Sequence, residues 1–143
     1  MRKTIGEAGL LSDDTRSEVL FRECTSTYRA YNPSGLRVLR YKVDGGIITI
    51  GSRCDYLLGI VSRRECYLIE LKGSDIKKAA EQILATLDAL GPRFDKYVVS
   101  ARIVLTRTPR PDLRSSILIK LERQIARLGG RVFRANRELS EQL

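Results

Sequence analysis

The sequence predicts an α/β fold with a mixed β-sheet in three layers, and three observations lead to this prediction. The expected elements run α-β-β-β-α-β and then continue with a helix and a short edge strand, so that strands in succession precede a βαβ unit. Two segments carry apolar side chains at helical spacing, whereas several others have the composition of strands. No repeat or linker interrupts the 143 residues, so we expect a single domain, 1–143.

The first predicted helix covers residues 13–24. Ser12 or Asp13 can cap its N-terminus, and acidic residues are enriched in its first turn. After a turn-rich segment, residues 36–43 alternate loosely between apolar and polar side chains, which indicates the first strand. This strand ends at residues 44–46 (Asp-Gly-Gly), a sequence typical of a hairpin.

The second strand is predicted over residues 47–61, with a bend or bulge at Gly51, and the third over residues 66–72. A helix capped by Ser74 is then expected over residues 75–90. Apolar side chains at helical spacing form the face that it would bury: Ile76, Ala79, Ala80, Ile83, Leu87 and Leu90.

The C-terminal part is expected to add a strand, a helix and an edge strand. Residues 97–105 are almost continuously apolar, as in a strand that is covered on both faces. Residues 113–128 have apolar side chains at helical spacing and are followed by two glycines. Residues 131–134 then form the short edge strand.

The formal net charge of +9 is concentrated in the C-terminal third. Between Arg93 and Arg137 lie 12 of the 26 basic residues but only 3 of the 17 acidic ones, so the rest of the chain has 14 of each sign. Ten of these 12 are arginines, whose planar fork suits phosphate oxygens. A nucleic acid is therefore the expected partner, and a merely solvated basic surface is the alternative. The candidate nucleic-acid contacts are Arg107, Arg110, Arg114, Arg123 and Arg127.

The chain contains no histidine, which excludes Ser-His-Asp and Cys-His catalysis as well as zinc sites with histidine ligands. Its three cysteines are widely spaced and form no CxxC motif, so we expect buried, reduced thiols. No apolar run approaches the length that crosses a bilayer, and no secretory signal is recognisable. We expect a cytoplasmic protein without a membrane partner.

Acidic and basic side chains meet in the predicted hairpin of the second and third strands. Glu70 and Lys72 share one face of a strand, because side chains two residues apart point the same way. If Val61 pairs with Cys66, Asp55 lies opposite Lys72 and diagonal to Glu70. A solvated strand face is the alternative, but the surrounding sequence is strongly apolar, and charged groups in such surroundings need partners or a purpose.

This cluster suits the hydrolysis of a phosphodiester. Asp55 and Glu70, together with the carbonyl of Leu71, offer oxygen ligands for Mg²⁺ or Mn²⁺. A metal ion there acidifies a water molecule and neutralises phosphate oxygens. Lys72 can orient the attacking water or stabilise the developing negative charge.

An Asp, a hairpin of about fifteen residues and an apolar-Glu-apolar-Lys sequence together resemble the PD-(D/E)xK nuclease superfamily. The resemblance covers about residues 13–106 and implies a restriction-endonuclease-like fold with an αβββαβ core. Asp55, Glu70 and Lys72 match the two acids and the lysine of the motif. Cys54 stands at the position of the usual proline.

The same resemblance implies two further site residues. Members often carry an acid on the first helix, for which Glu18 is the better candidate and Glu23 the second. A glutamine on the helix after the lysine recurs in exonuclease and RecB-like branches and matches Gln82, although Thr86 replaces the aromatic residue that follows it.

The resemblance implies a Mg²⁺- or Mn²⁺-dependent nuclease and a homodimer in which two sites address two strands. DNA is favoured over RNA as the substrate, and the sequence leaves the choice between them open. A non-catalytic nucleic-acid-binding or assembly module that retains the fold is the second hypothesis. A basic partner-binding protein without a nucleic-acid role is the third. Metal-dependent cleavage separates the first hypothesis from the second, and retention on nucleic acid at low salt separates both from the third.

Overall fold

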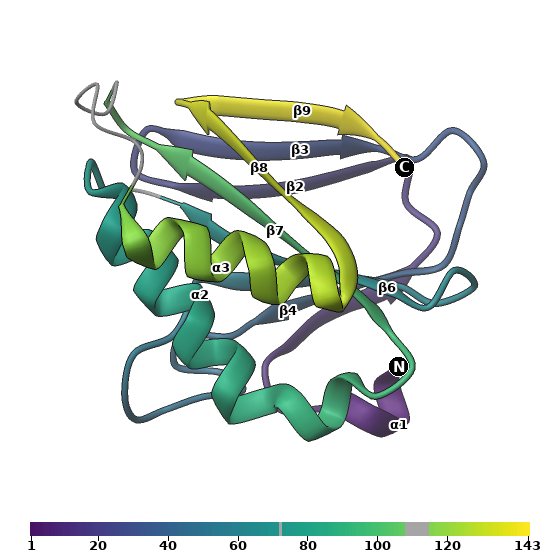
Figure 1. Cartoon of the computed structure of the whole chain (residues 1–143). Coiled ribbons are helices and arrows are strands. Elements are labelled where there is room, and N and C mark those ends of the chain that lie inside the picture. The colour runs from purple at the N-terminus through teal and green to yellow at the C-terminus, as the bar shows by residue number, and fades with distance from the viewer. Residues whose placement is uncertain (72, 108–114) are drawn as a thin grey trace.

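A computed structural model describes residues 1–71, 73–107 and 115–143 and has a mixed α/β architecture (Figure 1). One sheet has six strands in the order β1-β4-β5-β6-β7-β8, and a second has three in the order β2-β3-β9. The six-stranded sheet is mixed, because β1, β4, β5 and β6 are antiparallel neighbours whereas β6, β7 and β8 run parallel. No helix in the described ranges is long and apolar enough to span a membrane.

The elements have the following bounds. The six-stranded sheet consists of β1 (Leu10–Asp14), β4 (Val38–Lys42), β5 (Tyr56–Ile60), β6 (Glu65–Leu71), β7 (Val98–Leu105) and β8 (Gly129–Asn136). The three-stranded sheet consists of β2 (Glu18–Glu23), β3 (Ser26–Tyr31) and β9 (Glu138–Gln142). The helices are α1 (Arg2–Ile5), α2 (Ile76–Leu90), α3 (Ser116–Arg127) and the 3-10 helix η1 (Gly91–Phe94).

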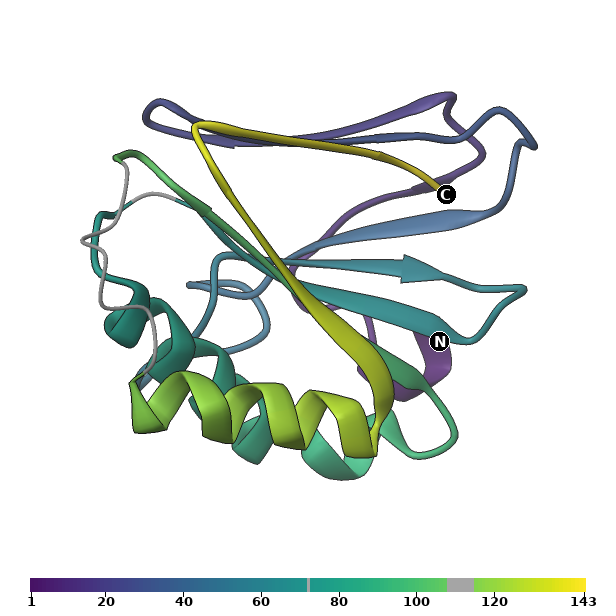
Figure 2. The ribbon, with the colours of Figure 1, turned by 45° about the horizontal axis from the view of Figure 1, so that its top comes forward.

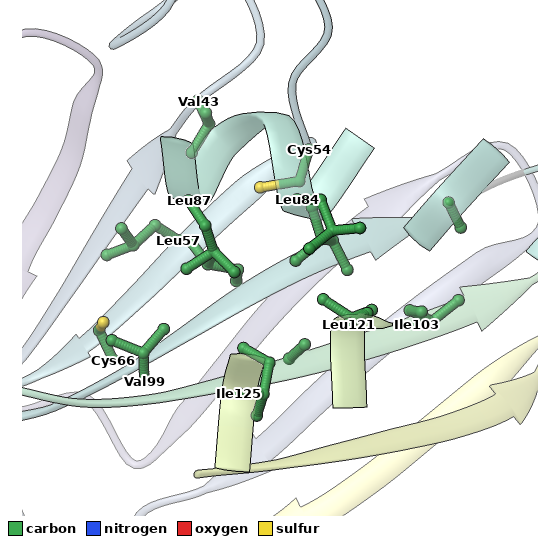
Figure 3. Packing of buried hydrophobic residues seen from close by; sticks show 14 of the residues in the cluster. Val43, Cys54, Leu57, Cys66, Leu84, Leu87, Val99, Ile103, Leu121 and Ile125 are labelled. Carbon is green, nitrogen blue, oxygen red and sulfur yellow. The ribbon is translucent and has the colours of Figure 1, made fainter. Parts of the chain in front are cut away.

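The molecule has three layers, with the six-stranded sheet in the middle (Figure 2). Helices α2 and α3 cover one face of this sheet, and the three-stranded sheet covers the other. Each interface has its own apolar core. On the helix side, Leu84 and Leu121 pack with strand residues such as Leu57 (Figure 3). Between the sheets, Phe21 and Ile69 belong to the second core. The central strands are therefore buried on both faces, which explains their almost continuous apolar sequence.

The predicted helix over residues 13–24 is wrong, because this segment ends β1 and then forms β2. Val19 and Phe21 are buried whereas the residues between and beside them are more exposed, which is the period of a strand. The hydroxyl of Ser12, a predicted helix cap, instead accepts a hydrogen bond from Arg40 at 2.8 Å. Short acidic segments suit a helix start and an edge hairpin equally well, and here pairing with β3 decides the conformation.

The predicted order of strands and helix from β4 to β7 is confirmed. Every residue assigned to the apolar face of the helix over 75–90 is buried. The cap is Asp75 rather than Ser74, because the Asp75 carboxylate accepts hydrogen bonds from the backbone N–H groups of Lys77 at 2.9 Å and Lys78 at 3.3 Å. The helix therefore begins at Ile76.

Several element boundaries differ from the prediction. Strand β5 begins at Tyr56 rather than at residue 47, because a loop containing the positive-φ glycines Gly45 and Gly51 precedes it. The predicted edge strand over 131–134 exists but extends over the whole of β8, and β9 was not expected at all. The described part of the predicted helix over 113–128 is α3, and the start of that prediction lies outside the described residues.

Candidate functional site

The candidate site lies at the edge of the sheet where β5 begins and β6 ends. Strand β7 runs parallel to β6, so its C-terminal end reaches the same edge. Gly73, which has a φ of +85°, turns the chain away after β6, and its carbonyl accepts hydrogen bonds from the Thr106 amide at 2.9 Å and hydroxyl at 3.0 Å. These two hydrogen bonds hold Gly73 beside Thr106, the residue that directly follows β7.

The register of β5 and β6 differs from the predicted one by two residues. Ile60 pairs with Glu65 and Tyr56 with Ile69, so that Val61 does not pair with Cys66. A shift of two residues leaves every side chain on its expected face, because the period of a strand is two. Asp55 precedes the paired residues, and its hydrogen bonds to Ile69 and Leu71 place it beside Glu70 rather than at the predicted level.

Asp55 is buried and held in a defined direction. Its carboxylate accepts a 2.8 Å hydrogen bond from the N–H of Leu71, and its own N–H donates to the carbonyl of Ile69 at 3.1 Å. Only 4% of Asp55 is exposed to solvent. Glu70, the residue between these two partners on β6, is 3% exposed. Two acidic residues are therefore buried side by side, one directly before β5 and the other near the end of β6.

Glu70 opens onto a pocket of about 560 Å³. Strand β6 supplies Glu70 at its end, helix α2 supplies one wall, and the turn between β2 and β3 reaches over from the other sheet. The lining residues are Cys24, Glu70, Gly73, Ser74, Asp75, Lys78, Ala79, Gln82 and Thr106. All three layers of the molecule thus meet at this pocket.

Helix α2 presents a polar stripe toward the site. Lys78, Gln82 and Thr86 are four residues apart and so share one side of the helix. Lys78 and Gln82 line the pocket. Thr86 is fully buried, and its hydroxyl accepts a hydrogen bond from the N–H of Cys54 at 2.8 Å and donates to the carbonyl of Gln82 at 2.8 Å. This bond connects the helix to the residue that precedes Asp55.

Glu23 lies near the site through its contact with Tyr56. The Tyr56 hydroxyl donates to the Glu23 carboxylate at 2.7 Å, and its ring stacks on Phe21 with 4.6 Å between centroids. Burial, followed by the bond to Glu23, raises the pKa of Tyr56, so this phenol stays protonated and acts as a donor. Of the two acids considered for the first segment, Glu23 is therefore the one beside the Asp55 segment.

The structure does not bring Glu18 to the pocket. Glu18 begins β2 and pairs with Tyr31, at the opposite end of the hairpin from Glu23. Its carboxylate forms an ion pair with Arg29 at 2.7 Å, and nearly half of its side chain is exposed. The expected role for Glu18 depended on a helix, and the strand that forms instead carries it away from the site.

The cysteines behave differently from one another. Cys54 and Cys66 are buried as expected, and burial raises the pKa of both thiols, which keeps them protonated. Cys24 is exposed and lines the pocket, which corrects the prediction for that residue. None of the three is in a disulfide.

The remaining predicted residues fall into two groups. Gln82 lines the pocket, and the backbone N–H of Leu71 donates a hydrogen bond to the Asp55 carboxylate. Arg107, after β7, and Arg123 and Arg127, on α3, are exposed, as a nucleic-acid contact requires. The predicted site residues that lie outside the described residues are Lys72, Arg110 and Arg114.

Lys78, Thr86 and Cys24 belong to the site region but were not predicted to act there. The four-residue spacing of Lys78, Gln82 and Thr86 is a sequence signal that could have identified the stripe. No local signal points to Cys24, because its turn reaches the pocket only through the packing of one sheet on the other.

Oxygen ligands are available for a hard cation, although they are few. In the described ranges no group of three or more His, Cys, Asp or Glu side chains is placed to hold a metal ion. Mg²⁺ typically takes one or two carboxylates and retains several waters, so the pair Asp55 and Glu70 fits its chemistry.

Comparisons with protein-family models, with curated proteins and with solved structures gave no significant match to this chain.

Proposed function

We propose that this chain is a metal-dependent nuclease of the PD-(D/E)xK type that hydrolyses phosphodiester bonds of nucleic acid, with DNA as the preferred substrate. The observation that carries the proposal is the pair of buried acids, Asp55 and Glu70, at neighbouring positions beside a pocket. Acidic side chains are rarely buried, and two of them side by side next to a pocket favour a functional role.

The strand order supports the finer proposal of a restriction-endonuclease-like core. Three antiparallel strands, β4, β5 and β6, are followed by α2 and by β7 parallel to β6, which is the βββαβ part of the core that the sequence resembles. The first helix of that core has no equivalent in residues 13–24, where β2 occupies the sequence.

Asp55 and Glu70 would hold the cation, with the carbonyl of Leu71 as a third oxygen ligand. Mg²⁺ or Mn²⁺ bound there supplies positive charge to the phosphate oxygens and acidifies a water molecule. The hydrogen bond from the Leu71 amide fixes the direction of the Asp55 carboxylate before any ligand arrives. Glu70 faces the pocket and so meets a substrate that enters it. Lys72 is proposed to orient the attacking water or to stabilise negative charge.

The exposed arginines supply the attraction for a polyanion. Arg107 follows β7 at the site edge, whereas Arg123 and Arg127 lie on the outer helix α3. Each phosphate that such a residue neutralises releases a counterion, so binding weakens steeply as salt rises. We also propose a homodimer, because two sites are needed to address two strands.

A cleavage assay tests the proposal directly. Labelled duplex, branched and single-stranded DNA and RNA are incubated with Mg²⁺, Mn²⁺ or EDTA. We expect cleavage only with metal, and a loss of about a hundredfold or more in Glu70→Gln and Lys72→Ala.

Glu65→Gln is the matched control, since Glu65 lies at the opposite end of the same strand. It should cleave like the wild type. Tight binding of nucleic acid without cleavage in either metal would instead support a non-catalytic binding module.

A further inference from the structure

The described lining of the pocket beside Glu70 contains one cation, Lys78. Lys78 lies in the first turn of α2, four residues before Gln82, so that both side chains face the pocket. It is exposed, and no ion pair joins it to an acidic residue in the part of the chain that the structure describes. Its ammonium group is therefore available to a ligand.

An anionic ligand in this pocket meets two acidic side chains, so a cation on the pocket wall would favour its binding. These two acidic residues of the lining are Glu70 and Asp75. The Asp75 carboxylate caps α2 through the amides of Lys77 and Lys78, so part of its charge is compensated by the helix N-terminus. A phosphate that approaches Glu70 is repelled by its charge, and an ammonium group on the pocket wall offsets that repulsion.

We propose that Lys78 binds the phosphate group of the substrate in this pocket, beside Glu70. This inference deepens the proposed function and rests on it for the identity of the ligand as a phosphodiester. The half-buried Gln82 lies one turn further along the same wall, where its side chain can add a neutral hydrogen bond. Lys78 thus directs a phosphate to the buried acids, whereas Arg107, Arg123 and Arg127 are not among the described residues that line the pocket.

Lys77 provides a control that separates position from charge. It is the preceding residue on α2, is exposed and carries the same charge, but it does not line the pocket. Successive residues on a helix point about 100° apart, so Lys77 faces away from the ligand that Lys78 would contact. Removing either lysine changes the net charge equally, and only the loss of Lys78 removes a pocket contact.

The experiment compares Lys78→Ala, Lys78→Arg and Lys77→Ala with the wild type. Binding of a fluorescein-labelled single-stranded DNA oligonucleotide is measured by anisotropy in EDTA over a range of salt concentrations, after circular dichroism has shown that each variant is folded. We expect Lys78→Ala to weaken binding about tenfold and to reduce the salt slope by about one. Lys77→Ala should change the affinity for the oligonucleotide less than about twofold. Lys78→Arg should restore most of the affinity.

A second measurement is the KM of cleavage in the presence of a metal ion. In Mg²⁺ or Mn²⁺, Lys78→Ala should raise KM about tenfold more than Lys77→Ala does. Equal effects of Lys77→Ala and Lys78→Ala on binding would overturn the inference, since both would then act only through net charge. Absence of cleavage by the wild type refutes the proposed nuclease, and the difference between the two lysines in EDTA still decides whether the pocket binds a phosphate through Lys78.

Discussion

The backbone N–H of Cys54 donates a 2.8 Å hydrogen bond to the hydroxyl of Thr86, in the interior of the protein. Proline, which usually stands at position 54 in the motif that this sequence resembles, has no N–H and cannot form this bond. The aromatic residue usual at position 86 has no equivalent hydroxyl near its backbone. The two departures from the motif are therefore complementary, and together they attach helix α2 to the residue before Asp55.

Replacing Thr86 with valine removes this acceptor while keeping the shape of the side chain. The buried Cys54 amide then lacks its partner, which we expect to lower the free energy of unfolding by about 1–3 kcal/mol. Urea unfolding monitored by circular dichroism measures the change. Thr86→Ser keeps the hydroxyl, so its free energy of unfolding should fall less than that of Thr86→Val. A valine variant as stable as the wild type would show that the hydrogen bond does not stabilise the fold.

A buried ion pair joins the two sheets, and breaking it should destabilise the protein strongly. The guanidinium of Arg102 on β7 contacts the Glu141 carboxylate on β9 at 2.7 Å and 3.1 Å. It also lies over the rings of Tyr67 and Phe133, at 4.2 Å and 4.3 Å from their centroids. Arg102 is 3% exposed, so Arg102→Leu leaves Glu141 without its cation in a mostly buried position. We expect a loss of about 3–5 kcal/mol in the free energy of unfolding.

Arg29→Leu is the control for that substitution. Arg29, on β3, forms an ion pair at 3.0 Å with Glu138, which lies on β9 as Glu141 does. Both side chains of this pair are more exposed than those of Arg102 and Glu141. The removal of Arg29 should destabilise the protein much less than the removal of Arg102, because solvent screens an exposed ion pair. A similar cost for both variants would show that burial of the Arg102 pair does not determine its contribution.

The pair of Asp14 and Arg16 predicts a local acid dependence. Hydrogen bonds from the Arg16 guanidinium lower the pKa of Asp14 to about 2 from its ordinary 3.8. Because the pKa is lower in the folded state, the stabilising contribution is complete above pH 3.8 and is lost as the pH falls through about 2. NMR titration of the Asp14 carboxyl in Arg16→Gln should return its pKa toward 3.8 while leaving Asp13 unchanged. An unaltered Asp14 pKa would contradict the assignment to Arg16.

Cys24 allows the pocket to be blocked chemically. It is the only exposed cysteine of the three, so N-ethylmaleimide should modify one thiol of the folded protein and all three after unfolding. Because Cys24 lines the pocket, the adduct should weaken oligonucleotide binding several-fold. Cys24→Ser should bind normally and resist the reagent. An adduct that binds as well as the untreated protein would place the ligand elsewhere.

Metal removal should change thermal stability if Asp55 and Glu70 hold a cation. A ligand that binds only the folded state at about 100 times its Kd adds about 2.7 kcal/mol to the free energy of unfolding. We expect Mg²⁺ or Mn²⁺ to raise Tm relative to EDTA in the wild type and in Glu65→Gln, and to have no effect in Glu70→Gln. An equal increase in all three proteins would indicate a cation bound away from this pair.

Local patterns determined much of the central architecture. The spacing of apolar residues in α2 and the apolar sequences of β6 and β7 predicted their type and order, because each is covered by apolar layers and its sequence reports that burial directly. The face of Glu70 was predictable for the same reason, since side-chain direction alternates along β6. The absence of histidine likewise excluded several classes of catalytic mechanism from composition alone.

Only the tertiary structure decided which distant segments meet. The register of β5 and β6 depends on the turn geometry of their hairpin, and the predicted and observed registers both preserve the same alternation. The hydrogen bonds of Asp55 to Ile69 and Leu71 then place it beside Glu70. Strand β2 was mistaken for a helix because its pattern is short and its conformation depends on pairing with β3, whose other edge pairs with β9 from the end of the chain. Cys24 reaches the pocket, and Arg102 reaches Glu141, through packing between the two sheets. Sequence periodicity reports how an element is buried, whereas contacts between segments far apart in the chain depend on which surfaces remain to be covered.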